Sequence, residues 1–147
     1  MAFGTDFGGD VQRFGERYRK RLRAVAREAV QDTISIAQAV EEKGGRMRID
    51  TGFLRASIQA ALHTMPSGPV RPKKGAKKGE YTRQVAGEPV AVALLRWDPN
   101  TSDRLFVGWT ANYARHREFQ DDFLSGAVEL WDQIVRRAAK KAAVGFG

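Results

Sequence analysis

Hydrophobic residues recur every three or four positions near the N-terminus of the chain. Between Asp10 and Glu42 this spacing predicts one long amphipathic helix. Its apolar stripe comprises Val11, Phe14, Tyr18, Leu22, Val25, Ala29, Ile36 and Val40. Such a helix is about 50 Å long, whereas a compact domain of this size is about 40 Å across. We therefore expect it to overhang its domain or to bend near Thr33 to Ile36, and to end at Gly44 and Gly45.

Three later segments show the pattern of strands. Ser57 to His63 alternates apolar with polar residues, as a half-buried strand does. Pro89 to Trp97 and Arg104 to Thr110 are rich in apolar residues, and the turn formers at 98–103 separate them. This arrangement predicts that the last two segments form an antiparallel hairpin.

A second apolar stripe runs from Asp121 to Val144 and predicts a C-terminal helix. The fold class expected is therefore α+β, a small antiparallel sheet packed with two long amphipathic helices in a single domain, residues 1–147. The large aromatic residues expected to pack in its core are Tyr18, Trp97, Trp109 and Trp131.

The segment Met65 to Glu80 is rich in proline, glycine and lysine. Nothing in its composition indicates core packing, so we expect a flexible basic loop at about residues 65–84. We also expect this loop to serve as an assembly arm that orders against a neighbouring molecule. The lysines assigned to that contact are Lys73, Lys74, Lys77 and Lys78.

The composition excludes several classes of protein and site. The 147 residues include no cysteine, which excludes disulfides, thiolate zinc sites and cysteine nucleophiles. No apolar run is long enough to cross a bilayer, and Met1 to Gly9 lacks a signal-peptide pattern. We therefore expect neither a membrane protein nor a secretory precursor.

The chain carries a net charge of +8, and its charge is unevenly distributed. Arg13–Arg27, Arg71–Arg83 and Gln133–Gly147 carry +6, +5 and +4, which leaves −7 for the remainder. A basic segment can bind phosphates, but no nucleic-acid-binding motif accompanies this one. We assign Arg17, Lys20 and Arg21 instead to the polar edges of the first helix, available for assembly.

Residues for catalysis are sparse. The chain has two histidines, His63 and His116, and no serine in the Gly-x-Ser-x-Gly motif of a hydrolase nucleophile. His116 and Glu118 could provide two metal ligands, but their spacing supplies no third ligand. The glycines and lysines of Gly75 to Gly79 lack the Gly-Lys-Ser/Thr of a phosphate-binding loop. We expect a non-enzymatic protein with no cofactor and no metal.

Two short segments resemble a known family. Thr51 to Ile58, with the sequence TGFLRASI, resembles the TGxLRxSI signature of the tail-completion or head–tail joining (neck) proteins of long-tailed bacteriophages and phage-like particles. Val107-Gly108, followed by Tyr113 to Phe119, resembles the second signature of that family. The motif residues that carry the resemblance are Thr51, Gly52, Leu54, Arg55, Ser57, Gly108, Tyr113, Ala114 and Glu118.

The resemblance implies a structural virion protein that forms a ring, a hexamer by analogy, at the head–tail interface. Its partners would be other copies of itself, the tail-tube protein and the head connector or stopper protein. DNA would pass through the channel without sequence-specific contact. The protein would be found in the tail or neck of the virion, and in the host cytoplasm during assembly.

Physical reasoning adds roles for single residues of the two segments. Gly52 permits a tight turn, and Leu54 and Ile58 are expected to enter the core. Tyr113 and Phe119 are expected to seat the second segment, which leaves Arg115, Arg117 and Glu118 for neighbouring subunits. Ordinary core and turn roles remain the alternative for these motif residues. The alternative function is a basic nucleic-acid-binding protein.

Overall fold

The computed structural model describes residues 7–48, 50–66 and 68–146. Residues 1–6, 49, 67 and 147 lie outside the described residues, and so do the parts of the predictions that fall on them: the start of the N-terminal segment, one position of the basic loop and both ends of the predicted domain. In chain order the elements are α1 Phe7–Ala37, η1 Glu41–Lys43, α2 Phe53–Ala56, β1 Ile58–Leu62, α3 Val90–Arg96, β2 Leu105–Trp109, α4 Ala114–Asp121, α5 Phe123–Val128 and α6 Trp131–Phe146.

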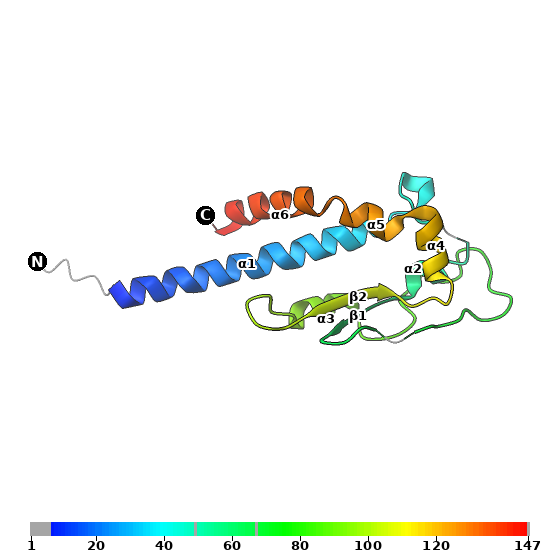
Figure 1. Ribbon diagram of the computed structural model, residues 1–147, viewed down its shortest axis with the longest axis horizontal. Helices are drawn as coiled ribbons and strands as arrows, with labels where there is room; N and C mark the ends of the chain where they lie inside the picture. Colours follow the sequence, from blue (N-terminus) through cyan, green and yellow to red (C-terminus); the bar gives the residue numbers. More distant parts are fainter. Residues whose placement is uncertain (1–6, 49, 67, 147) are drawn as a thin grey trace, which may run out of the picture.

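The fold is α+β, as predicted, with the long helix α1 in its middle. Figure 1 shows α6 along one side of α1 and the β1–β2 ribbon with α3 along the other. Between the two helices, Ala29 of α1 packs with Ile134 and Ala138 of α6, and all three are buried. The apolar stripes predicted from the sequence therefore meet each other along this part of α1.

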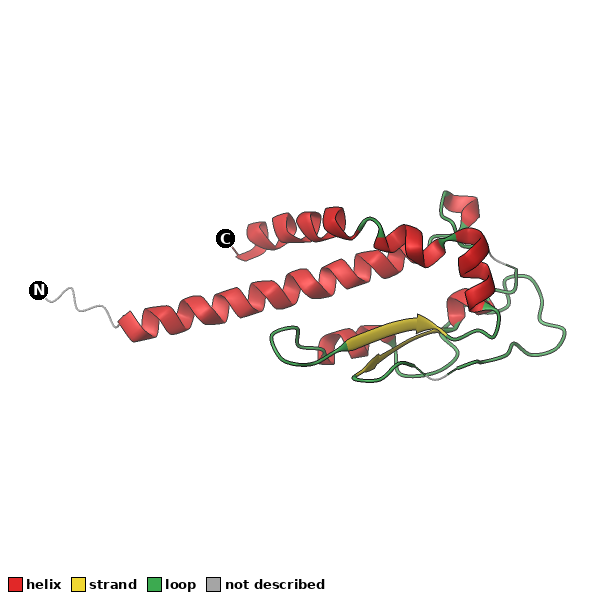
Figure 2. Cartoon of the chain, viewed as in Figure 1, coloured by secondary structure: helices red, strands yellow, loops and turns green. Residues whose placement is uncertain are grey.

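The sheet differs from the predicted hairpin. β2 pairs with β1, antiparallel, in a register that runs from Ile58 opposite Trp109 to Leu62 opposite Leu105 (Figure 2, strands in yellow). The strand predicted at Pro89 to Trp97 is wrong, because Val90–Arg96 forms α3 and buries Ala93 and Leu94. A short apolar run fits a helix as well as a strand, and Pro89, just before the first helical turn, suits a helix start.

The helix predicted from Asp121 to Val144 is two helices, α5 and α6, and its first residue, Asp121, belongs to α4. Asp122 adopts a left-handed conformation, with φ of 51°, between α4 and α5, and a further break separates α5 from α6. The prediction that Trp131 packs in the core is wrong, because this side chain lies at the break and is 41% exposed. Trp109 packs against the core as predicted, and Trp97 is half-buried.

The first helix overhangs the domain, and Figure 1 shows no bend at Thr33 to Ile36. It ends at Ala37 rather than Glu42 because the chain then folds back on itself. Gly45 donates its backbone N–H to the carbonyl of Val40 at 2.8 Å. A Cβ at Gly45 would lie 2.0 Å from the carbonyl oxygen of Ala39, so only glycine fits this return.

A second cluster of buried side chains lies where α2, α4 and α5 meet the end of α1. It centres on Phe53 and includes Met47 and Phe123. Val70 and Tyr81 of the basic loop pack against it, so the expectation that nothing in this loop packs on the core is wrong. Tyr81 stacks edge-to-face on Phe53 with 5.0 Å between ring centroids. The loop is therefore anchored on both sides of its lysines.

Candidate assembly surfaces

The two signature segments lie side by side in the fold. β1 continues from the end of the first segment and β2 contains Val107-Gly108 of the second, and these strands pair, with Gln59 opposite Gly108. The ring of Tyr113, from the second segment, packs against Phe53 of the first, with 6.4 Å between the ring centroids. Burial is the main cause that raises the pKa of Tyr113. The two segments thus build one structural unit.

Gly52 is required by its backbone geometry. It has φ of 85° immediately before α2, in the left-handed region that favours glycine. A Cβ at this position would lie 2.4 Å from the carbonyl oxygen of Tyr81. Thr51 supports the same turn, because its hydroxyl accepts a hydrogen bond from the N–H of Phe53 at 3.2 Å. The tight turn predicted at Gly52 is confirmed.

Other motif residues are parts of the core. Leu54, Ser57 and Ala114 are buried. The Ser57 hydroxyl donates to the carbonyl of Leu54 at 2.7 Å, which satisfies a polar group that has no access to water. Arg55 is the exposed side chain of this segment. Most of these motif residues therefore have ordinary roles in the core or in a turn. Arg55 is the residue of this segment whose side chain is available to a partner.

Glu118 and Arg117 make contacts within the chain, contrary to the expectation that they are left for neighbours. The Glu118 carboxylate accepts hydrogen bonds from the backbone N–H groups of Leu124 at 2.8 Å and Ser125 at 2.9 Å, and from the Ser125 hydroxyl. It therefore caps the start of α5. Burial acts to raise the pKa of Glu118, but the hydrogen bonds from Ser125 and Leu124 outweigh it and lower the pKa.

Arg117 pairs with Asp121 at 2.6 Å, and only 2% of the Asp121 side chain is exposed. Arg48 lies 3.4 Å from the other oxygen of the same carboxylate. The prediction that Asp121 begins the last helix is wrong, because this residue ends α4. Arg115 is exposed and forms no ion pair with another described residue. Phe119 is also exposed, with 87% of the residue accessible. The prediction that Phe119 seats this segment is wrong.

The lysines of the basic loop divide into two pairs. Lys73 lies 3.1 Å from Glu80, and Lys78 lies 4.0 Å from Glu42, so both have acidic neighbours within the chain. Lys74 and Lys77 are exposed and have no such neighbour among the described residues. These two are the lysines of the loop with charge left for a partner.

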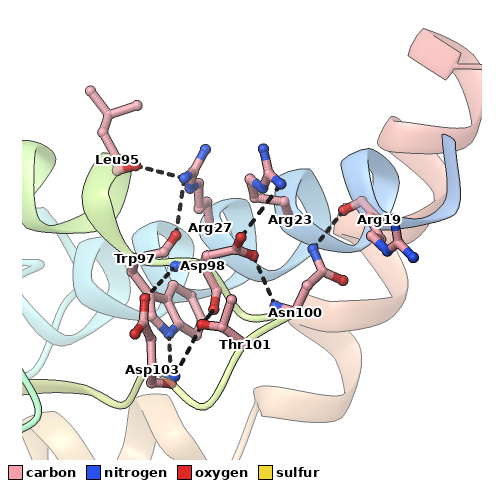
Figure 3. Close-up of polar contacts among 9 residues, drawn as sticks. All are labelled: Arg19, Arg23, Arg27, Leu95, Trp97, Asp98, Asn100, Thr101 and Asp103. Atoms are coloured by element: carbon pink, nitrogen blue, oxygen red, sulfur yellow. Dashed lines mark hydrogen bonds and ion pairs between the residues drawn. The ribbon is translucent and has the colours of Figure 1, made fainter. Parts of the chain in front are cut away.

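A cluster of arginines on α1 holds the loop that follows α3. Arg27 donates to the carbonyls of Leu95 at 2.6 Å and Trp97 at 3.0 Å. Arg23 lies 3.5 Å from Asp98 (Figure 3). The pKa of Asp98 is lowered, mainly by the backbone hydrogen bond from Asn100, with Arg23 and Arg27 contributing. We call Arg23 and Arg27 the arginine clamp.

The sequence analysis missed this clamp, although its spacing was a usable signal. Arg19, Arg23 and Arg27 recur every four residues, so they share one face of α1. The backbone carbonyl of Arg19 also accepts a hydrogen bond from Asn100 at 3.0 Å (Figure 3). Arg23 and Arg27 therefore hold this loop through their charged side chains, whereas Arg19 holds it through its backbone.

The three basic residues assigned to assembly lie outside the clamp. Arg17, Lys20 and Arg21 are exposed and form no ion pair or side-chain hydrogen bond with another described residue. Beside them the apolar stripe is also uncovered, with Phe14 72% and Tyr18 61% exposed. The expectation that Tyr18 packs in the core is wrong, because most of its side chain is exposed. This projecting part of α1, residues 8–22, is called the arm below.

No group of three or more metal-ligating acids and histidines occurs in the part of the chain that the structure describes. His63 lies 3.3 Å from Asp103, and His116 is exposed on α4. A groove of about 750 Å³ beside the first signature is lined by charges of both signs, among them Glu41, Asp50 and Arg55. Neither histidine is among its lining residues.

Comparison with protein-family models, with curated proteins and with solved structures found no match to this chain. None of the described helices is both long enough and apolar enough to cross a bilayer.

Proposed function

We propose that this protein is a structural virion component that assembles as a ring, a hexamer by analogy, at the head–tail junction of a phage or phage-like particle. The ring joins the tail tube to the head connector and leaves a channel for DNA. The observation that carries the assembly is the arm, whose exposed apolar stripe continues a stripe that is buried further along the same helix. Exposed apolar surface of this kind is typical of interaction sites.

Placement at the neck depends on the two signature segments. They support the proposal because they form one paired unit in this fold, through β1 and β2 and through the contact of Tyr113 with Phe53. The residues left exposed around this unit, Arg55, Lys74 and Lys77, provide charge for neighbours in the assembly. The protein therefore combines an apolar arm for itself with a charged face for other particle components.

Assembly is tested by light scattering on the purified protein, alone and with purified tail tubes. We expect a discrete oligomer, with or without the tubes. A strict monomer in both conditions, even at high concentration, would refute the ring.

Joining is tested in particles that carry the double change Lys74→Glu and Lys77→Glu. The melting temperature should stay nearly unchanged, because neither lysine has an acidic neighbour in the fold, while heads should fail to join tails. The control is Lys74→Arg with Lys77→Arg, which keeps the charge. Normal yields of joined particles from the charge-reversed variant would contradict this role.

The alternative, a nucleic-acid-binding protein, is favoured by the free charge of Arg17, Lys20 and Arg21. It predicts DNA binding that weakens steeply as salt rises. The guanidinium groups of Arg23 and Arg27 are held in the clamp, which reduces the charge available to phosphates. A gel-shift titration at two salt concentrations separates this alternative from a ring that forms without DNA.

A further inference from the structure

The apolar stripe of α1 changes its environment abruptly along the helix. At Val25, Ala29 and Ile36 it packs against α6. In the arm the same stripe continues as Val11, Phe14, Tyr18 and Leu22, and all four side chains are exposed. The arm therefore presents the kind of surface that α6 covers elsewhere, and a helix or apolar patch of another molecule can take the place of α6.

The charge beside this stripe restricts what can cover it. At 100° per residue Arg17 and Arg21 lie on one edge of the stripe and Arg19 lies on the other. Two arms packed against each other would bring these like charges together. The surface that fits the arm is an apolar patch with acidic residues beside it.

Such a patch is present on this chain at the break between α5 and α6. Residues 128–133, with the sequence VELWDQ, are all exposed. Val128, Leu130 and Trp131 provide the apolar surface, and Glu129 and Asp132 provide acidic charge with no ion pair to another described residue. The nearest basic residues in sequence, Arg136 and Arg137, lie about one turn further along α6.

Two other exposed apolar side chains, Leu95 and Phe119, lie next to basic as well as acidic residues. Leu95 is followed by Arg96, which pairs with Glu88 at 2.7 Å, so its surroundings are neutral. Phe119 lies on α4 among Arg115 and His116 as well as acids. Residues 128–133, called the acidic patch below, match the arm best in both apolarity and charge.

The arm cannot reach the acidic patch of its own chain. α6 begins at Trp131, and its next turn, at Ile134 and Val135, packs in the cluster that Ile36 contacts, near the far end of α1. Tyr18 precedes Ile36 by a helical distance of about 27 Å. A contact between arm and patch must therefore join two molecules.

We infer that the arm of one molecule packs on the acidic patch of a second copy, with Arg17 and Arg21 facing Glu129 and Asp132. The two surfaces differ, so the contact can repeat head-to-tail from copy to copy and close as a ring, whereas a reciprocal exchange of arms between two copies would stop at a dimer. This inference depends on the ring of the proposed function and names the surfaces that form it.

Charge reversal tests the contact. Arg17→Glu with Arg21→Glu should weaken self-association at least about tenfold, and Glu129→Arg with Asp132→Arg should do the same. The chain that carries all four changes should regain most of the association, because the charges are again opposite. Arg83→Glu with Arg104→Glu, which reverses two exposed basic residues outside both surfaces, is the matched control and should leave association unchanged. Circular dichroism checks that each variant is folded.

Disulfide trapping tests the same contact without changing charge. Because the natural chain has no cysteine, Tyr18→Cys on one tagged chain and Trp131→Cys on another introduce a single pair. Mild oxidation of the mixture should give predominantly crosslinked dimers with one chain of each kind. Glu16→Cys, on the opposite face of the arm, replaces Tyr18→Cys in the control and should crosslink far less.

The outcomes separate this inference from the proposed function. An oligomer that survives both charge reversals, and that crosslinks equally well through Glu16→Cys and Tyr18→Cys, overturns the arm–patch contact and leaves the ring standing. A wild-type protein that is monomeric with and without tail tubes overturns both. Loss of DNA binding in the arm variant, with the oligomer intact, also overturns the contact and favours the nucleic-acid alternative.

Discussion

The two halves of α1 have the same periodicity and opposite environments. In the C-terminal half Ala29 is fully buried against Ile134 and Ala138 of α6. In the arm, Phe14 and Tyr18 are mostly exposed on the same stripe. The difference arises because α6 is about half the length of α1, which leaves the arm without a cover. Periodicity therefore identifies a surface that needs a partner, and the length of the neighbouring element decides whether that partner is in the same molecule.

The largest contrast is expected between a core phenylalanine and one in the arm. Phe53→Ala should lower the free energy of unfolding by about 3 to 5 kcal/mol, because Phe53 is 2% exposed and packs against Tyr81 and Tyr113. Phe14→Ala, measured under dilute conditions, should change it by no more than about 0.5 kcal/mol. Urea unfolding measures both. Equal losses would show that the arm is covered in the monomer.

The next effect concerns the buried carboxylate of Asp121. Arg117→Ala removes its 2.6 Å partner and should cost about 2 to 3 kcal/mol, less than for a fully isolated pair because Arg48 remains 3.4 Å away. Arg115→Ala, on the exposed side of the same helix, is the control and should cost little. If the two variants unfold at the same urea concentration, the ion pair does not stabilise the fold.

The arginine clamp should give a smaller effect. Arg27→Ala leaves the carbonyls of Leu95 and Trp97 without this donor and should cost about 1 to 2 kcal/mol. Amide hydrogen exchange should speed up in α3 and in the loop after it, because they lose their tie to α1. Arg17→Ala, about three turns nearer the N-terminus and outside the clamp, should leave both quantities unchanged. If exchange speeds up equally in the Arg17→Ala variant, the effect does not come from the contacts of Arg27 with the loop.

The smallest effect is expected from the cap at α5 and should depend on pH. Glu118→Gln should cost about 0.5 to 1 kcal/mol at pH 7, at the low end for a helix cap because the site is partly open to solvent. The pKa of Glu118 is lowered in the folded protein, so its contribution is present above the ordinary value of 4.5 and is lost as the pH falls below it. The wild-type protein should therefore lose more stability than the variant between about pH 5 and about pH 3. Parallel curves from thermal unfolding would rule out this cap.

Local patterns predicted several elements correctly. The long α1, the strands at Ile58–Leu62 and Leu105–Trp109, and the turn at Gly52 each follow from residues close together in the chain. They succeed because an amphipathic period or a left-handed glycine is decided by neighbouring residues.

The failures concern segments whose surroundings come from elsewhere in the chain. Val90–Arg96 is apolar enough for either a strand or a helix, and it forms a helix whose final carbonyls accept hydrogen bonds from Arg27. Glu118 and Arg117 follow the pattern of exposed charges, yet each has a partner nearby on α4 or α5. The role of Glu118 depends on the left-handed turn at Asp122, which the uninterrupted stripe did not indicate. Arg117 pairs with Asp121 four residues further along the same helix, a spacing that was present in the sequence.

The α+β composition, the apolar stripe of α1 and the surplus of basic charge can all be read from the order of the residues. The folded arrangement shows which part of that stripe is buried, which arginines belong to the clamp, and that Trp131 lies in an exposed acidic patch. The physical reason is that periodicity depends on local geometry, whereas burial and charge pairing depend on which distant segment arrives at each surface. On α1, that segment is α6, and it ends before it reaches the arm.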